Sequence, residues 1–273
     1  MRILFIGDVF GEAGRDIIVD RLFRIRHEEK IDFCIANCEN ASHGRGLSRR
    51  NADELLESGV DFITMGNHTF SNNDIYEYIN DYPIVRPCNL SRTLPGKGVA
   101  AVEHKGLRIG IINIEGRVFI EPAGNDPFEA ADNALKELSE KYGQCDIIVT
   151  DFHAETTSEK KALALYLDGR VSAVIGTHTH VQTADEQVLK KGTAFITDAG
   201  MTGISQGESV IGMDSRLVTE KFIKGVPVRF EPAVKGEVEL DGVIMDFEEK
   251  KEEGLLKIRE FRRVKYDFGG VGK

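Results

Sequence analysis

The chain has 273 residues, of which 41% are hydrophobic and 29% are charged, and its formal net charge is −10 at pH 7. The apolar fraction is sufficient for a large core, and the absence of a run of about 18 apolar residues argues against a membrane-spanning helix. The acidic balance argues against an extended nucleic-acid footprint, which needs clustered lysine and arginine. It permits a small phosphorylated substrate, because bound metal ions reverse the local sign of charge.

Predicted strands and helices alternate in the first third of the chain. The first is a strand at residues 3–6, which is too short for the apolar core of a signal peptide and ends at Gly7-Asp8. Beyond it we expect a helix at 16–29, a strand at 32–37, a helix at 48–58 capped by Ser48, a strand at 61–65 and a short helix capped by Ser71. This alternation favours a sheet with helices on its faces.

The middle of the chain begins with a predicted β-hairpin, whose strands at 99–104 and 107–114 are split by Lys105-Gly106. Helices are expected at 127–141 and 158–167, and strands at 147–150, 171–175 and 194–197. The pattern therefore remains α/β through this region.

Beyond residue 205 the pattern loosens. A helix is expected at 214–224, followed by the segment 226–230, and strands at 238–247 and 255–264 are expected to pair around the charged turn 248–254. No repeat or Pro/Gly linker is present, so residues 1–273 are expected to form a single α/β domain with a small insertion at about 205–235.

The four cysteines show no CxxC spacing. They are too few for a disulfide scaffold and favour a cytoplasmic protein with reduced thiols. Cys38 precedes Glu39 and is interpreted as a small packing residue, with a thiolate ligand as the minor alternative.

Five short polar clusters each follow a predicted buried strand. They are Gly7-Asp8, Glu39-Asn40, Gly66-Asn67-His68, Asp151-Phe152-His153 and Gly176-Thr177-His178-Thr179-His180. Carboxylate, amide and imidazole groups at successive strand ends are the ligands that two divalent cations about 3.5–4 Å apart require. The clusters therefore predict metal-assisted cleavage of a phosphoester.

The histidines differ in how strongly they indicate a metal. Alternation along a strand would put His178 and His180 on one face, where two imidazoles have no packing role, so both are predicted ligands together with His153. Asp8 has the alternative of capping the following helix, and Asn40 that of supporting a ligand from behind.

In order and spacing these clusters, together with the motifs at 6–11, 37–40, 65–68, 176–180 and 197–203, resemble those of the calcineurin-like metallophosphoesterases. The YmdB-like bacterial branch is the most similar, and the resemblance covers nearly the whole chain. It implies a four-layer α/β/β/α sandwich with a small inserted cap.

The resemblance also implies a role for each residue. Glu39 would bridge two metal ions, and His68 would be catalytic, facing the scissile phosphate as a transition-state stabiliser or proton donor. The remaining implied metal ligands are Asp8, Asn40 and His180 at the first site and Asn67, His153 and His178 at the second.

The chain departs from the broader superfamily at the first metal site, in ways that the YmdB-like branch shares. Phe10 occupies the position of a histidine, and Glu39 that of the bridging aspartate. We interpret the amide of Asn40 as the substitute for the missing imidazole. Oxygen-rich and imidazole-containing sites favour Fe and/or Mn, with Mg or Zn possible.

Four residues are candidates for substrate binding. His43 and Arg45 lie in a glycine-flanked loop just beyond Asn40, Arg117 follows a predicted strand, and Thr202 belongs to the motif at 197–203. A surface ion pair is the alternative for Arg117. Asp198 in the same motif either orients a ligand histidine or is a strand-end turn residue.

The expected function is hydrolysis of 2′,3′-cyclic, and in second place 3′,5′-cyclic, nucleoside monophosphates by a metal-bridging hydroxide. The ligand set predicts phosphoester hydrolysis, and only the resemblance predicts this substrate. The alternatives are a phosphomonoesterase or 5′-nucleotidase on the same metal core, a metal- or nucleotide-binding regulatory protein, and a nuclease, which the negative charge disfavours. A homo-oligomer fits the resemblance.

Overall fold

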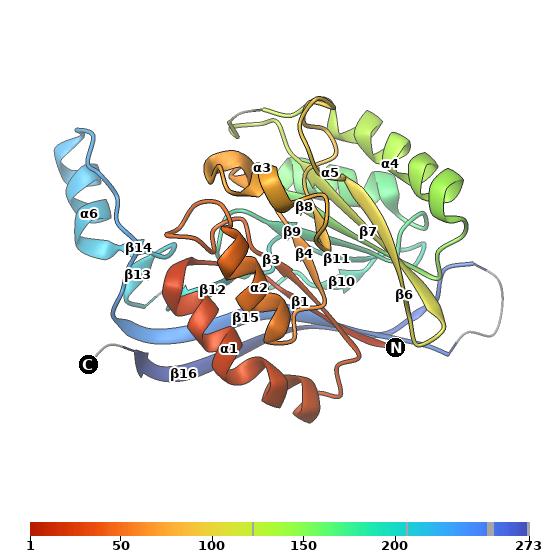
Figure 1. The fold of residues 1–273 in the computed structure, drawn as a ribbon, viewed down its shortest axis with the longest axis horizontal. Helices are drawn as coiled ribbons and strands as arrows, with labels where there is room; N and C mark the ends of the chain where they lie inside the picture. Colours follow the sequence, from red (N-terminus) through yellow and green to blue (C-terminus); the bar gives the residue numbers. More distant parts are fainter. Residues whose placement is uncertain (122, 206, 250–253, 272–273) are drawn as a thin grey trace.

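The computed structural model describes residues 1–121, 123–205, 207–249 and 254–271. Two β-sheets lie face to face, and helices cover the outer face of each (Figure 1). This four-layer α/β/β/α arrangement confirms the fold class expected from the sequence. Within the described ranges, no helix has both the length and the apolar character needed to cross a membrane.

The first sheet has the strand order β2-β12-β15-β1-β3-β4-β5, and β16 pairs with β15. Its strands are β1 (Arg2–Ile6), β2 (Asp8–Val9), β3 (Phe33–Asn37), β4 (Phe62–Thr64), β5 (Ile84–Val85), β12 (Met201–Ile204), β15 (Gly236–Phe247) and β16 (Ile258–Val271). The run β1, β3, β4 and β5 is parallel, as the predicted alternation of strands and helices requires.

The second sheet has the order β10-β11-β9-β8-β7-β6. Its strands are β6 (Val99–His104), β7 (Leu107–Glu115), β8 (Ile147–His153), β9 (Ala173–Thr177), β10 (Gln187–Val188) and β11 (Ala194–Ile196). β6 and β7 form the predicted antiparallel hairpin, and β7, β8, β9 and β11 run parallel.

The helices are α1 (Gly11–Glu28), α2 (Arg49–Glu57), α3 (Ile75–Tyr78), α4 (Pro127–Tyr142), α5 (Thr157–Leu167) and α6 (Ser215–Lys224), with a 3-10 turn at Thr69–Ser71. The alternation along β1 shows how the layers form. Leu4 and Ile6 pack with helices α1 and α2, whereas Ile3 and Phe5 pack between the two sheets. Burial of such side chains stabilises the fold by about 1.5–3 kcal/mol each.

Two helix starts differ from the predictions. Helix α1 begins at Gly11 rather than at 16, because its first turn uses small residues that carry no apolar signal: a Cβ on Gly14 would lie 2.2 Å from the Thr202 carbonyl oxygen. Ser71 does not cap a helix, since it lies in the 3-10 turn and Asp74 precedes α3. The predicted cap at Ser48 is confirmed, because the backbone N–H of Asn51 donates a hydrogen bond to the Ser48 hydroxyl over 3.3 Å.

The strands absent from the sequence prediction are short. They are β2, β5, β10, β12 and the hairpin pair β13 (Ser209–Val210) and β14 (Met213–Asp214). Two to four residues are too few to show a period, and only pairing with a longer neighbour makes them strands. The predicted pairing of the last two strands is confirmed, although β16 starts at Ile258 and continues past 264. Residues 250–253 of the predicted turn lie outside the described residues.

The segment 207–235 contains β13, β14 and α6, and α6 stands apart from the two sheets at the left of Figure 1. Phe222 and Ile223 on α6 are both 78% exposed, and residues 226–230 have no regular structure. The tip of the β13–β14 hairpin, Ile211-Gly212, reaches back toward Phe10, since a Cβ on Gly212 would lie 2.6 Å from that ring.

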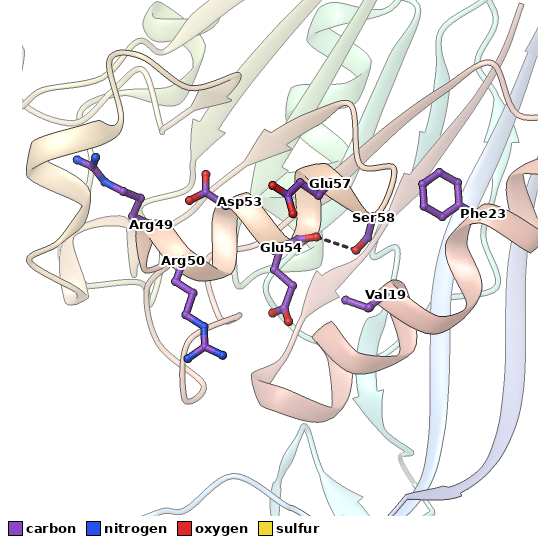
Figure 2. Close-up of a pocket in the computed structure, with 8 residues that line it drawn as sticks. All are labelled: Val19, Phe23, Arg49, Arg50, Asp53, Glu54, Glu57 and Ser58. Carbon is purple, nitrogen blue, oxygen red and sulfur yellow. Dashed lines mark hydrogen bonds between the residues drawn. The ribbon is translucent and has the colours of Figure 1, made fainter.

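A groove lies on the outer helical layer between α1 and α2 (Figure 2). Val19 and Phe23 form its apolar side and Arg49, Asp53 and Glu57 its charged side. None of the five polar clusters contributes to its lining.

Candidate metal centre

The polar clusters meet at the carboxyl ends of the parallel strands. Strands β3, β4, β8 and β9 end at or just before Glu39, Gly66, His153 and His178, respectively. Parallel strands that end at the same edge bring such loops together, which is where ligand sites form in sheets of this type.

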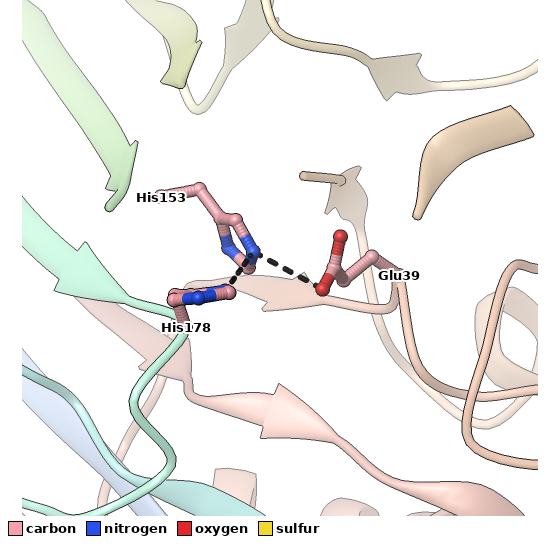
Figure 3. Close-up of side chains that lie close together, drawn as sticks. All are labelled: Glu39, His153 and His178. Carbon is pink, nitrogen blue, oxygen red and sulfur yellow. Dashed lines mark hydrogen bonds and ion pairs between the residues drawn. The ribbon is translucent and has the colours of Figure 1, made fainter. Parts of the chain in front are cut away.

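Three potential ligand atoms lie close to a fourth at this edge. The Nε2 atom of His153 lies 3.1 Å from Glu39 Oε1, 3.1 Å from Asn67 Oδ1 and 3.1 Å from His178 Nδ1. Among the described residues, Glu39, His153 and His178 offer ligand atoms that all lie within 4.8 Å of one another (Figure 3). The structure thus brings together the residues that the resemblance places at the second metal.

The residues expected at the first metal adjoin this group. His180 Nε2 lies 3.1 Å from the Asn40 amide nitrogen and 3.8 Å from Asp8 Oδ1. The same Asn40 nitrogen lies 3.1 Å from Glu39 Oε1, the oxygen that also contacts His153. Glu39 therefore stands between the two halves of the cluster.

The chemistry of this donor set fits bound cations. Asp8 is fully buried, and its Oδ1 atom has no hydrogen-bond partner among the described residues. Burial raises the pKa of Asp8, and His180 and His153 offset that only in part. An unpartnered carboxylate oxygen in a buried cluster of acceptors costs free energy that a cation would recover.

Protonation of His153 stands in for a cation in the metal-free protein. Burial opposes its charged form, but Glu39, Asp8 and Asp151 outweigh burial and raise the pKa of His153 to about 9. Burial likewise opposes the ionised form of Glu39, yet His153 and His68 hold the pKa of that carboxyl well below its usual range. Metal binding would therefore release a proton from this cluster.

Each predicted imidazole ligand has its outer nitrogen held by an acceptor. Nδ1 of His153 lies 2.9 Å from Thr177 Oγ1, Nε2 of His178 lies 3.0 Å from Glu155 Oε2, and Nδ1 of His180 lies 3.1 Å from the Ile211 carbonyl oxygen. An outer N–H fixed in this way leaves the inner nitrogen with a lone pair directed at the cluster, as metal-binding histidines require.

His178 and His180 do not lie on one face of a strand, so the prediction that strand alternation pairs them was wrong. Strand β9 ends at Thr177, so strand alternation does not bring the two imidazoles together. Both residues instead have positive φ, 95° for His178 and 62° for His180. Non-glycine residues in this region cost of order 1–3 kcal/mol each and persist only where their surroundings hold them, often at functional sites.

The comparison with protein families agrees with this geometry. A family model described as "YmdB-like protein" matches residues 4–259. The chain belongs to the YmdB-like family. A curated member, the 2′,3′-cyclic-nucleotide 2′-phosphodiesterase of Bacillus subtilis, is 46% identical over 256 residues, which cover 93% of this chain and 94% of that protein.

Two solved structures resemble this YmdB-like protein along its whole length. A hypothetical protein from Thermus thermophilus superposes with a TM-score of 0.88 at 39% identity, covering 98% of this chain and 99% of that one. A phosphatase from Mycoplasma pneumoniae has a TM-score of 0.86 at 37% identity, with 98% and 93% covered. A 5′-nucleotidase precursor from T. thermophilus, at 13% identity and a TM-score of 0.53, shares the fold alone. The protein is a hydrolytic phosphoesterase of this fold.

The remaining predicted site residues differ in their burial and in their contacts. The half-buried His68 donates its backbone N–H to Glu39 Oε2 over 2.8 Å. His43 and Arg45 are exposed on the loop beyond Asn40. Arg117 is exposed and lies 3.6 Å from Asp126, which is the surface ion pair considered as its alternative. Thr202 is fully buried in β12.

Phe10 and Asp198 are clarified by the structure. The Phe10 ring lies edge-on to the His180 ring, with centroids 5.5 Å apart. Phe10, which occupies the position of the superfamily histidine, therefore packs against a predicted metal ligand. Asp198 contacts the turn that carries two of the predicted ligands. It accepts the backbone N–H of Thr179, between His178 and His180, over 3.0 Å.

Sequence reasoning missed the residues that support the cluster from behind. They are Asn37, Thr64, Gly66, Asp151, Glu155, Lys160, Thr177 and Ile211. Asn37, Gly66, Asp151 and Thr177 stood within recognised motifs but were given no role, and a polar residue inside a buried strand was the available signal for Asn37, Asp151 and Thr177. The Ile211 carbonyl carries no signal in its side chain.

Proposed function

We propose that this phosphoesterase hydrolyses cyclic nucleotides, with 2′,3′-cyclic nucleoside monophosphates as the preferred class and 3′,5′-cyclic monophosphates as a secondary one. The observation that carries the proposal is the convergence of Glu39, His153 and His178 with Asn67 on one side and Asp8, Asn40 and His180 on the other. The 46% identical relative supplies the substrate class.

Seven residues would hold two metal ions, Fe and/or Mn in the first place. Asp8, Asn40 and His180 serve one, Asn67, His153 and His178 the other, and Glu39 both. When bound, such a pair of ions activates water and neutralises charge on a phosphoryl group. The protein supplies hydrogen-bonded imidazoles and buried surroundings for the ions, since Asp8 and His153 are fully buried.

His68 is the proposed catalytic side chain. Its backbone is tied to Glu39, which places the half-buried imidazole beside the metal cluster. Burial lowers the pKa of His68, and the nearby Arg45, His153 and His180 lower it further. A neutral imidazole donates a hydrogen bond to the charged phosphoryl oxygens, so we assign His68 to transition-state stabilisation rather than to proton donation.

The substrate approaches over the loop that carries His43 and Arg45. The charge of Arg45 lies close enough to lower the pKa of His68, so Arg45 belongs to the surroundings of the proposed catalytic side chain. A guanidinium there matches phosphate geometry well. We keep His43 and Arg45 as substrate-binding candidates, rank Arg117 below them because of its ion pair with Asp126, and leave out the buried Thr202.

A phosphomonoesterase on the same metal core is the second candidate, because one of the two structurally similar proteins is described as a phosphatase. The deciding experiment is a substrate panel assayed with added Mn²⁺ or Fe²⁺: 2′,3′-cyclic and 3′,5′-cyclic monophosphates, a model phosphodiester, and a nucleoside 5′-monophosphate. The proposal expects the highest kcat/KM on a 2′,3′-cyclic nucleotide, abolished in Asn67→Ala. Preferred release of phosphate from the monoester would overturn it.

A further inference from the structure

A lysine is buried behind the candidate metal centre. Lys160 on α5 is only 1% exposed, although lysine is almost never fully buried unless it is paired. Its ammonium lies 2.8 Å from Asp198 Oδ2 and 3.4 Å from Thr179 Oγ1. Asp198 is itself fully buried. A complete ion pair therefore lies in the interior, in contact with Thr179 of the Gly176–His180 cluster.

The carboxylate of Asp198 accepts hydrogen bonds from the turn that joins two predicted ligands. Its Oδ2 accepts the Thr179 backbone N–H over 3.0 Å and the Thr179 hydroxyl over 2.6 Å, and its Oδ1 accepts the Gly200 N–H over 2.9 Å. Thr179 separates His178 from His180. A displacement of Thr179 would therefore move both imidazoles.

That turn needs to be held. His178 and His180 both have positive φ, a conformation that L residues rarely adopt and that relaxes unless neighbouring contacts fix it. Glycine at position 176 leaves space for the lysine side chain. A Cβ there would lie 3.1 Å from Lys160 Cδ and 1.7 Å from the Thr197 carbonyl oxygen.

A purely stabilising role does not account for this pair. Buried ion pairs generally add little or no net stability relative to well-packed apolar residues, whereas loss of one partner leaves an uncompensated buried charge. The Oδ2 atom of Asp198, which pairs with Lys160, also accepts both hydrogen bonds from Thr179, and Thr179 lies between two candidate ligands.

We propose that Lys160 is a positioning residue for the metal centre: it neutralises and holds Asp198, which clamps Thr179 and so sets the positions of His178 and His180. The inference rests on the proposed function, because it assumes that these histidines bind metal. It extends that function by assigning a role to a helix residue that touches neither metal nor substrate.

The test measures Mn²⁺ binding to metal-stripped protein by calorimetry for wild type, Lys160→Met and Lys161→Met. Lys161 is the matched control, because it is the next residue of α5 and packs over Phe195, 4.6 Å from the ring centroid. We expect the Kd for Mn²⁺ to rise by about 10–100-fold in Lys160→Met, as for other residues that orient ligands, and to stay unchanged in Lys161→Met. At saturating Mn²⁺, KM should match wild type, since the substrate groups are untouched.

A double variant, Lys160→Met with Asp198→Asn, separates positioning from packing. Removing both charges leaves an acceptor for Thr179, so the double variant should bind Mn²⁺ more tightly than Lys160→Met alone. An unchanged Kd in Lys160→Met, or no gain in the double variant, would overturn the proposal. If Lys160→Met does not fold, Asp198→Ala decides, because it removes the acceptor oxygens that contact Thr179, and a wild-type Kd in that variant has the same consequence.

The two proposals fail in different ways. Wild-type protein that binds Mn²⁺ but hydrolyses none of the panel substrates would refute the proposed function and leave the role of Lys160 testable by calorimetry. Wild-type protein that hydrolyses them, with equal Mn²⁺ affinity in Lys160→Met and Lys161→Met, would refute the positioning role alone.

Discussion

The Nε2 atom of His153 and the Nδ1 atom of His178 face each other at 3.1 Å, with the outer nitrogen of each ring already committed elsewhere. Two lone pairs at this distance repel each other unless a proton or a cation lies between or beside them. Burial, with the neighbouring His153 adding to it, lowers the pKa of His178 to about 3, so His178 stays neutral. His153 takes the proton in the metal-free protein, and a bound cation would replace that proton.

The hydroxyl of Thr177 fixes the tautomer of His153, which gives the first prediction. Thr177 donates its O–H to Asp151 Oδ1 over 2.7 Å and therefore accepts the N–H of His153 Nδ1 over 2.9 Å. Thr177→Val removes this relay at nearly constant volume and should weaken metal affinity by about 10–100-fold. Thr177→Ser keeps the hydroxyl and is the control.

Metal content after dialysis against a limiting concentration of Mn²⁺ measures this effect. A Thr177→Val protein that retains as much metal as Thr177→Ser would contradict the relay. Thermal unfolding of both proteins in the metal-free state checks that the comparison is between folded molecules.

A second prediction follows from the closeness of Gly66 to the cluster. A Cβ at this position would lie 2.4 Å from His153 Nε2 and 2.5 Å from Glu39 Oε2, closer than real Cβ atoms approach any neighbour. Gly66→Ala should therefore displace the proposed bridging carboxylate and the imidazole and lower kcat/KM by at least about 100-fold, as misplacement of reacting groups does.

The control for this substitution is Gly269→Ala, because a Cβ on Gly269 meets nothing within 4 Å. Steady-state assays at saturating Mn²⁺ should separate the two variants. Near-normal turnover in Gly66→Ala would show that Glu39 and His153 have room to move without loss of function.

His68 gives a third prediction, in which metal content and turnover separate. The contact of His68 with Glu39 is made by its backbone N–H, which an alanine at this position keeps. His68→Ala should therefore retain both metal ions, yet lose about 10²–10³-fold in kcat because a preorganised donor to the phosphoryl oxygens is gone.

Elemental analysis and kinetics on the same preparation test this separation, with Asn67→Ala as the comparison. The Asn67 Oδ1 atom lies 3.1 Å from His153 Nε2, so that variant should lose metal as well as turnover. Loss of metal in His68→Ala would instead make His68 part of the ligand set.

The sequence predicted the alternation of strands and helices and the polar clusters because both depend on local patterns, whereas the four-layer arrangement was implied only by the resemblance. Apolar runs bounded by polar strand ends indicate a parallel sheet, and the order of ligand types along the chain indicates a metal site. Ser48 was recognised as a cap for the same reason, since capping depends on a few consecutive residues.

The missed features depend on contacts between distant segments. The Ile211 carbonyl reaches His180 across 31 positions, and Asn37 reaches Asp151 across 114. Strand β12 is recognisable only because it pairs with β2 and β15. The positive φ of His178 and His180 has no signature in their residue types, because histidine ordinarily adopts negative φ.

A last prediction concerns stability rather than catalysis. Asp241 on β15 is 1% exposed, and burial, with Glu239 and Asp267 adding to it, raises its pKa to about 7 despite Lys265 at 3.8 Å. In the unfolded chain this pKa is about 3.9. As pH rises from about 4 to 7 the unfolded state loses its proton first, so the folded state binds more protons and the free energy of unfolding falls. Above pH 7 the folded protein carries the full free-energy cost of the ionised, buried Asp241.

Asp241→Asn carries no titratable proton and keeps an acceptor oxygen, so it should be more stable than wild type by about 1–3 kcal/mol at pH 8. The difference should shrink as the pH is lowered and vanish near pH 4. Urea unfolding at several pH values measures it, with the exposed Asp81→Asn as the control that should show no such trend. A stability difference for Asp241→Asn that does not change between pH 4 and pH 8 would mean that Asp241 is ionised throughout that range, held so by Lys265.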